Sequence, residues 1–278
     1  MSSYTKRAGE NCTIVRAESH RTGCQSWHRA CALLQLSVRA EGILEQSGCN
    51  VSARASAGVA SPCGGGAGTG SAADFIPPRA TLSKLRDAAT RCRGCDLWTC
   101  GRVVFGEGPR DATVMFVGEQ PGDQEEQAGH PFVGPAGKLL DAALEEAGID
   151  RTSVYVTNAV KHFKYERGAK SARRIHKKPN DTEIRACHPW LEQEIRLTKP
   201  LVIVVLGATA AQSLLGKQFR VTQQRGKPVK SELAGTVIAT VHPSSVLRAP
   251  DGKRERARRE FFADIRAVAR HIARAQPA

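Results

Sequence analysis

Several features are scarce in this 278-residue sequence, and each argues against a particular class of protein. Aromatic residues make up only 5% of the chain, which argues against a single-strand binding platform built from stacked rings. No run of about eighteen apolar residues occurs, so the sequence predicts no transmembrane helix and no membrane partner. No apolar signal-peptide segment follows the N-terminus, so we expect a cytoplasmic protein rather than a secreted one.

Acidic residues are too few to balance the basic ones. Lys and Arg total 41 against 27 Asp and Glu, which gives a formal charge of +14 and a pI near 9.7. Such a charge favours a polyanionic partner, and nucleic acid is the commonest one. We therefore expect the chain to bind nucleic acid.

The nine cysteines lack the pattern of a disulfide scaffold, because their number is odd and no signal peptide precedes them. In a reducing compartment, closely spaced cysteines are more typical of metal ligation. Cys92 and Cys95 have the C-x2-C spacing of a metal site, and Cys100, His162 and Cys187 are further candidate ligands. The residues alone do not separate a zinc ion from an iron–sulfur cluster, and buried thiols without a metal are the plainer alternative.

Residues 1–74 differ in composition from the rest of the chain. They are rich in Ser, Ala, Gly and Arg, lack a helical or strand-like period, and include the Gly-rich stretch 61–71. We predict a low-complexity, disordered extension, whether as a DNA-tracking tail, a targeting segment or an extension without a structural role. The globular domain is expected to span residues 75–278.

Strand-like and helix-like segments alternate in this domain. Strands are expected at 113–117, 154–157, 201–206 and 236–241, and helices at 136–147, 181–197, 208–215 and 255–274, after a short helix capped by Thr81 or Ser83. This alternation predicts an α/β fold, a three-layer αβα sandwich around a four-stranded parallel sheet. Ligands of such sheets bind beyond the carboxyl ends of the strands.

Polar side chains stand where three of these strands end. Glu119 and Gln120 lie in the turn after the first strand, Asn158 ends the second, and His242 follows the fourth. We therefore expect them around one cleft. The turn at 118–122 is not a Walker loop, because no Gly-Lys-Ser/Thr follows, and an ordinary turn is its alternative.

Each of these positions has a chemical interpretation. The amide of Asn158 offers a donor and an acceptor side by side, which matches the O4 and N3–H edge of uracil, although a turn-forming asparagine is the alternative. Phe132 lies in a loop between prolines and glycines, where a core phenylalanine is less expected and its ring can stack on a flat ring. His242 can donate to a carbonyl oxygen that gains charge as a bond breaks, unless it is a structural histidine, and Arg248 can hold a phosphate.

A basic loop is expected at 170–179, projecting from the same end of the sheet. Six of its ten residues are Lys, Arg or His, with His176 near its centre, so it cannot lie in an apolar core. Arg173 and Arg174 are expected to hold DNA phosphates. A solvated loop that contacts phosphate, or nothing, is the plainer interpretation.

Together, five motifs in this order resemble the uracil-DNA glycosylase superfamily, most closely its family 4 iron–sulfur branch and, within that branch, the UdgX-like proteins. They are GEQPGDQE at 118–125, HPFVGPAGKLLD at 130–141, VYVTNAVKHF at 154–163, RRIH at 173–176 and HPSSVLR at 242–248. The resemblance covers about residues 75–275. It implies the uracil-DNA glycosylase fold.

The resemblance also implies a [4Fe–4S] cluster. Family 4 enzymes hold it with four cysteines, and Cys92, Cys95 and Cys187 match three of them. His162 stands at the place of the fourth, as in the UdgX-like branch, whereas Cys100 matches no ligand position.

In UdgX-like proteins, the histidine of the RRIH-type motif attacks the sugar carbon that departing uracil leaves, and the protein stays covalently bound to the abasic DNA. His176 matches that histidine, and Glu119 is expected to accept the imidazole proton. By the same resemblance, Gln120 and Asp123 line the site. Ala172 replaces the usual lysine of the motif, which we expect to matter little because neighbouring basic residues supply the charge.

We therefore expect a monomeric uracil-DNA glycosylase of DNA-repair type. It is predicted to flip and excise uracil from single- or double-stranded DNA and to stay linked through His176. Two alternatives remain: a conventional family 4 enzyme in which water attacks, and a non-catalytic iron–sulfur module that binds damaged DNA.

Overall fold

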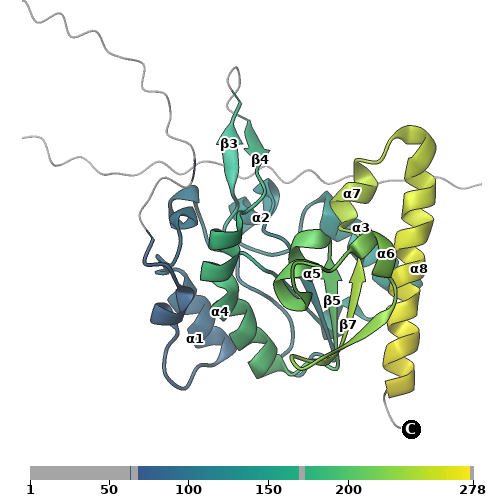
Figure 1. The fold of residues 1–278 in the computed structure, drawn as a ribbon, viewed down its shortest axis with the longest axis horizontal. Helices are drawn as coiled ribbons and strands as arrows, with labels where there is room; N and C mark the ends of the chain where they lie inside the picture. The colour runs from purple at the N-terminus through teal and green to yellow at the C-terminus, as the bar shows by residue number, and fades with distance from the viewer. Residues whose placement is uncertain (1–62, 64–67, 169–172, 276–278) are drawn as a thin grey trace, which may run out of the picture. The chain divides into compact units, whose positions relative to one another are not determined.

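A computed structural model describes residue 63 and residues 68–168 and 173–275 (Figure 1). The strands are β1 (Val114–Gly118), β2 (Val154–Asn158), β3 (Tyr165–Arg167), β4 (Arg174–His176), β5 (Val202–Leu206), β6 (Pro228–Ser231) and β7 (Gly235–Thr240). The α-helices are α1 (Leu82–Ala89), α2 (Asp123–Ala128), α3 (Pro135–Glu146), α4 (Asp181–Thr198), α5 (Ala208–Leu215), α6 (Val221–Gln224), α7 (Pro243–Leu247) and α8 (Asp251–Ala275). The 3-10 helices are η1 (Ala72–Phe75), η2 (Asp96–Cys100) and η3 (Arg151–Ser153).

The central sheet has the strand order β2–β1–β5–β7–β6. The first four of these strands are parallel, as the sequence predicts, and β6 runs antiparallel to β7 at the edge. The four-stranded prediction was therefore one strand short. β6 lacks the apolar run that marks the others because it alternates exposed and partly buried residues, and its first residue, Pro228, suits an edge strand.

Alternate residues of each strand face opposite layers, because side chains along a strand have a period of two. Phe116 and Val204 lie on the face that packs against α3, α7 and α8. Met115 and Val205 lie on the other face, against α4 and α5. β1, β2 and β5 are buried on both faces along their whole length, so the three-layer α/β architecture is confirmed.

A third apolar cluster holds the N-terminal part of the domain against α4. Leu85 of α1, Leu97 of η2 and Trp190 of α4 meet there. Thr81 caps α1 as predicted, its hydroxyl accepting from the Lys84 N–H at 3.3 Å. Ala72 is fully buried in the same cluster, so the packed domain begins before the predicted boundary at 75, whereas residues 1–62 lie outside the described part.

The predicted basic loop is partly a hairpin. β3 and β4 pair antiparallel, with Tyr165 opposite His176 and Arg167 opposite Arg174. Residues 169–172 lie outside the description. The hairpin stands at the end of the molecule toward which β5 and β7 point, so the strand-end rule placed it correctly while its pairing was missed (Figure 1).

Along the described residues, no helix combines the length and the apolar character needed to cross a bilayer.

Candidate active site

One cavity of about 830 Å³ opens at the carboxyl ends of the parallel strands. Its lining includes all ten residues predicted for catalysis and substrate binding. These are Glu119, Gln120, Asp123, Phe132, Asn158, Arg173, Arg174, His176, His242 and Arg248. The sequence-based expectation that these side chains share one cleft agrees with this geometry, while their individual roles stay predictions.

The floor of the cavity depends on a glycine. A Cβ on Gly118 would lie 2.3 Å from Asn158 Oδ1 and 2.9 Å from Phe132 Cζ, closer than van der Waals contact allows. Phe132 adopts a left-handed backbone conformation with φ of +58°, which turns its buried ring into the site. The absent side chain at 118 therefore lets the amide and the aromatic ring share one small space.

His242 is a neutral hydrogen-bond donor. Burial, with the charges of Arg248 and His176, lowers the pKa of His242 to about 4, so its imidazole is uncharged near pH 7. Its Nδ1 accepts the Ser244 backbone N–H at 3.2 Å. Because Nδ1 uses its lone pair there, the ring proton resides on Nε2. The ring also stacks on Phe132, with centroids 6.3 Å apart.

His176 lies at the mouth of the cavity with half of its side chain exposed, 51% by area. Its Nε2 is 3.4 Å from Glu119 Oε1. Burial lowers the pKa of His176 from its ordinary 6.5, Glu119 acts in the opposite direction, and Arg248 lowers it further. The imidazole is therefore neutral near pH 7 and keeps a lone pair for bond formation.

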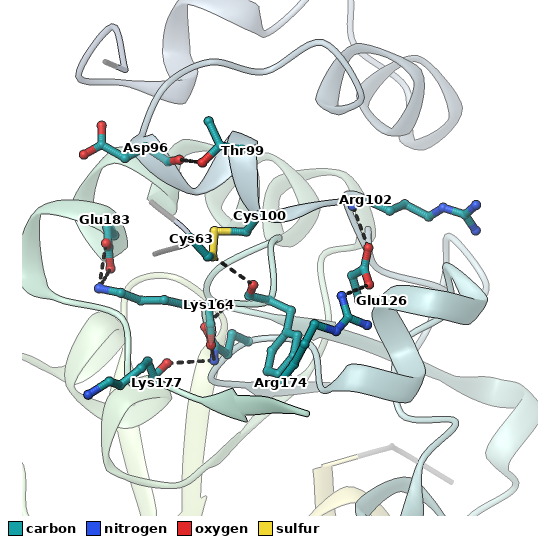
Figure 2. Close-up of a disulfide and its surroundings, with 12 residues drawn as sticks. Cys63, Asp96, Thr99, Cys100, Arg102, Glu126, Lys164, Arg174, Lys177 and Glu183 are labelled. Atoms are coloured by element: carbon teal, nitrogen blue, oxygen red, sulfur yellow. Dashed lines mark hydrogen bonds and ion pairs between the residues drawn. A yellow bond between two sulfur atoms is a disulfide. The ribbon is translucent and has the colours of Figure 1, made fainter. Parts of the chain in front are cut away.

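Gln120 anchors the hairpin that carries His176. Its amide nitrogen donates to the carbonyls of Lys164 at 3.2 Å and Lys177 at 3.0 Å, and its oxygen accepts the Lys164 N–H at 3.1 Å. Lys164 Nζ in turn pairs with Glu183 of α4 at 2.8 Å (Figure 2). The amide of Gln120 thus fixes the base of the hairpin relative to β1.

Arg174 is held by two carboxylates of α2. Its guanidinium pairs with Asp123 at 2.5 Å and with Glu126 at 2.7 Å, and it lies over the rings of Phe163 and Tyr165. Figure 2 shows its reach to Glu126. These pairs neutralise much of its charge, whereas Arg173 and Arg248 are exposed and form no ion pair within the described residues.

Three predicted metal ligands, Cys92, Cys95 and Cys187, are reduced thiols, and two of them accept N–H groups. Cys92 Sγ accepts from Trp190 Nε1 and the Gly94 N–H, both at 3.4 Å, and Cys187 Sγ accepts the Lys161 N–H at 3.3 Å. Burial raises the pKa of Cys95 to about 11 and that of Cys187 to about 12.

The fourth predicted ligand, His162, directly follows Lys161 and is buried, which lowers its pKa to about 4. No group of three or more His, Cys, Asp and Glu side chains within the described ranges is arranged to hold a metal ion.

Cys100 forms a disulfide with Cys63, although the cysteine pattern argued against a disulfide scaffold. The Cα atoms are 4.9 Å apart, and the bond joins the segment before the domain to η2 (Figure 2). Cys63 lies within the Gly-rich stretch, which has no pattern from which a partner could be predicted. The bond removes Cys100 from the candidate metal ligands.

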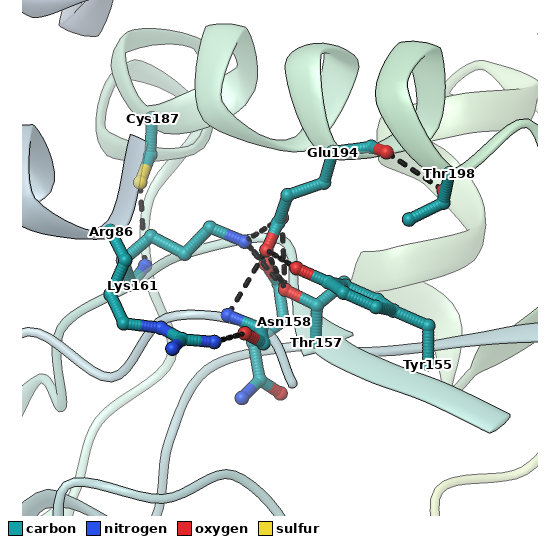
Figure 3. A network of polar contacts seen from close by, with 9 residues as sticks. Arg86, Tyr155, Thr157, Asn158, Lys161, Cys187, Glu194 and Thr198 are labelled. Carbon is teal, nitrogen blue, oxygen red and sulfur yellow. Dashed lines mark hydrogen bonds and ion pairs between the residues drawn. The ribbon is translucent and has the colours of Figure 1, made fainter. Parts of the chain in front are cut away.

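A buried ion pair supports the strand that ends in Asn158. Lys161 Nζ, 1% exposed, donates to Glu194 Oε2 at 2.5 Å, to Thr157 Oγ1 at 2.7 Å and to the Asn158 carbonyl at 2.7 Å (Figure 3). Glu194 also accepts from Tyr155 OH and Thr157 Oγ1, each at 3.0 Å. All three ammonium donors are used, so the network is satisfied without water.

Replacing Glu194 by alanine is expected to reduce the free energy of unfolding by about 3–5 kcal/mol, because it leaves the buried Lys161 ammonium without its carboxylate partner. Denaturant unfolding monitored by circular dichroism measures this. Glu255→Ala, which removes an exposed partner of Arg259 on α8, is the control and should change stability by less than about 1 kcal/mol. Equal effects of the two substitutions would contradict the account of the network.

Several residues of the site were not predicted. Thr209 donates to Glu119, Ser244 fixes the tautomer of His242, and Lys161 with Glu194 supports Asn158. Thr209 follows β5 just as Asn158 ends β2, so the strand-end rule could have found it. The network behind Asn158 had no such signal in the sequence, because Lys161 and its partner Glu194 lie 33 residues apart.

Comparison with known proteins shows the family of the chain. The profile of the uracil DNA glycosylase superfamily matches residues 105–266. A type-4 uracil-DNA glycosylase of Thermotoga maritima is 39% identical over 166 residues, which cover 59% of this chain and 82% of that protein. The chain is also 37% identical to a type-4 uracil-DNA glycosylase of Pyrobaculum aerophilum, over 61% of this chain and 86% of that protein. It is 36% identical to a type-4 uracil-DNA glycosylase of Sulfurisphaera tokodaii, over 62% of this chain and 78% of that protein. The chain belongs to the uracil DNA glycosylase superfamily.

Proposed function

We propose that this protein excises uracil from DNA, acting as a monomer, and remains joined to the abasic sugar through His176. The observation that carries the proposal is the position of His176. Its neutral imidazole borders the cavity lined by Asn158, Phe132 and His242, with the Glu119 carboxylate beside it. The type-4 uracil-DNA glycosylases among the relatives support uracil as the base.

In this proposal, the flipped base enters between Phe132 and Asn158. The Phe132 ring supplies an apolar face for stacking, and the Asn158 amide pairs with uracil O4 and N3–H. Cytosine carries an amino group at C4 instead of a carbonyl, so the same amide orientation presents a donor to a donor. The Lys161 network supports this discrimination because it holds the Asn158 backbone.

Bond cleavage follows at C1′. The C1′–N1 bond breaks and both electrons leave with uracil, whose negative charge spreads onto O2. The Nε2–H of His242 donates to that oxygen, and it does so as a neutral group. The sugar is left as an oxocarbenium ion, which needs a nucleophile.

The imidazole of His176 supplies that nucleophile. One ring nitrogen gives its lone pair to C1′, the ring proton passes to Glu119, and the uracil anion takes a proton from solvent. Atoms and electrons balance without an oxidant. An imidazole already held at the cavity mouth has a large effective concentration, so it captures the ion ahead of water.

The rate of adduct formation at acid pH should depend on the protonation of His176. Protonation removes its lone pair, so the single-turnover rate of adduct formation should be level near pH 7–8 and fall at acid pH, with a midpoint below 6.5. Rapid-quench assays from pH 4.5 to 8 measure it. A rate that rises as the pH falls below 6.5 would contradict attack by neutral imidazole.

We further propose that Cys92, Cys95, Cys187 and His162 hold a [4Fe–4S] cluster. Three reduced thiols, each buried or half-buried, suit the thiolate-rich ligation of such clusters, and N–H donors onto sulfur are a recurrent feature of these sites. When bound, the cluster supplies covalent cross-links through iron between the segment at 92–95 and α4.

Removal of a ligand should be visible without any activity assay. Cys187→Ser is expected to lose most of the iron, acid-labile sulfide and visible absorbance of the purified protein. The control is the Cys63→Ser and Cys100→Ser double variant, which removes the disulfide cysteines and should retain the iron. A wild-type protein without iron and sulfide after anaerobic purification would overturn the cluster proposal.

The proposed function is tested by product stoichiometry. A tenfold excess of uracil-containing oligonucleotide, single-stranded or duplex, is incubated with the protein, and total uracil release is measured. We expect release to stop at one uracil per protein molecule, with none from a thymine-containing control. Continued turnover would establish the conventional glycosylase that uses water, and no release from either strand form would favour the non-catalytic module.

A further inference from the structure

We propose that Thr209 is a positioning residue for the covalent step and aims the Glu119 carboxylate at His176. This inference rests on the proposed function. The geometry divides the two carboxylate oxygens of Glu119 between two partners. Oε2 accepts a hydrogen bond from the Thr209 hydroxyl, and Oε1 faces His176 Nε2 at 3.4 Å.

The neighbouring central strands bring these residues together. β1 and β5 pair in parallel, with Val117 opposite Val205. Glu119 follows β1 directly, and Thr209 follows β5 as the second residue of α5. The two side chains therefore extend from two fixed strand ends, whereas His176 stands on the hairpin across the cavity.

The hydroxyl of Thr209 is used by its hydrogen bond to Glu119. Thr209 is only 5% exposed, and its hydroxyl makes no second hydrogen bond within the described residues. A buried hydroxyl requires a partner, and donation to a carboxylate is stronger than donation to a neutral acceptor. Without it, the Glu119 side chain, still 22% exposed, is free to turn Oε1 toward solvent.

Loss of the Thr209 hydroxyl should affect the capture of the sugar by His176 rather than the cleavage of the C1′–N1 bond. Uracil departure uses His242 and Asn158, and among the described residues Thr209 forms a hydrogen bond with Glu119 and with neither of these two. Proton acceptance and ring orientation at His176 use Glu119, which Thr209 holds. Loss of the hydroxyl should therefore leave excision nearly unchanged and slow the attack of imidazole, so that water captures more of the sugar.

The partition between adduct and free abasic DNA measures this effect. Thr209→Val keeps the shape and removes the hydroxyl, and we expect about a ten- to hundredfold lower ratio of adduct to free abasic product, since small misplacements of a reacting group cost this much. Thr209→Ser restores the hydroxyl and should restore most of the ratio. Thr198→Val, a buried threonine of α4 that bonds a backbone carbonyl, is the control and should leave the ratio unchanged.

The outcomes separate this inference from the proposed function. If wild-type protein forms the adduct and Thr209→Val partitions as wild type does, the role of Thr209 is refuted and the covalent mechanism stands. If Thr209→Ser fails to recover while both variants melt at the wild-type temperature, the hydroxyl is not the operative group. If wild-type protein forms no adduct, both the covalent mechanism and this role are refuted.

Discussion

Replacing His176 by alanine is expected to abolish the covalent protein–DNA product. The substitution removes the imidazole that lies at the cavity mouth, beside Glu119 at 3.4 Å. It leaves the stacking ring of Phe132, the amide of Asn158 and the donor of His242 in place. Uracil should therefore still be released, with water filling the vacated space, so free abasic DNA should replace the adduct.

The measurement for this variant combines a denaturing gel with alkali cleavage of the same samples. His271→Ala is the matched control, because that histidine lies on α8 and bonds Thr236 outside the cavity. We expect the control to form adduct at the wild-type rate. An adduct that persists in His176→Ala would identify another nucleophile and refute the assignment.

Replacing His242 by alanine is expected to slow uracil release by about 10²–10³-fold, the usual effect of losing one donor to a developing oxyanion. The neutral ring, with its proton on Nε2, is the donor that we propose for uracil O2, and burial keeps it neutral. Because bond cleavage precedes capture, adduct and free abasic product should fall together. This common loss distinguishes His242 from Thr209 and His176, which affect the partition.

The matched control is His242→Gln, which retains an amide donor of similar length and should lose less activity than the alanine variant. Single-turnover uracil release with protein in excess measures both, and thermal melting shows whether either variant is folded. Release by the alanine variant within about threefold of wild type would contradict the oxyanion role, since one donor is worth far more.

The strands and their ends could be predicted because burial on both faces leaves a clear pattern. Runs such as Leu201–Leu206 have few explanations other than a buried parallel strand, and the carboxyl ends of such strands gather functional groups. Asn158 and His242 were located in this way, far apart in sequence and around one cavity in space. The edge strand β6 was missed because its half-exposed residues carry no such pattern.

Partner choice among polar side chains could not be predicted. Gln120 was expected to contact substrate, yet its amide bonds the base of the hairpin. Arg174 was expected to hold phosphate, yet Asp123 and Glu126 pair with it. Both outcomes follow from how β1 and α2 approach the hairpin, and a single sequence does not report that approach.

Gln120 and Arg174 both affect the position of the hairpin that carries His176. The hairpin that carries His176 is short, and it is held by Gln120, in the turn after β1, and by Asp123 and Glu126 of α2. Contacts at Gln120 and Arg174 thus contribute to placing His176, the proposed nucleophile. Phosphate binding by the exposed Arg173 and Arg248 stays a prediction.

The central claim is that uracil excision ends in a bond between DNA and His176. The most direct measurement mixes wild-type protein with end-labelled, uracil-containing single-stranded DNA, boils the mixture in detergent and separates it on a denaturing gel. The account predicts a slowly migrating band that survives boiling, requires uracil, and yields a peptide carrying the DNA on His176 by mass spectrometry. Free, alkali-cleavable abasic DNA without any such band would contradict it.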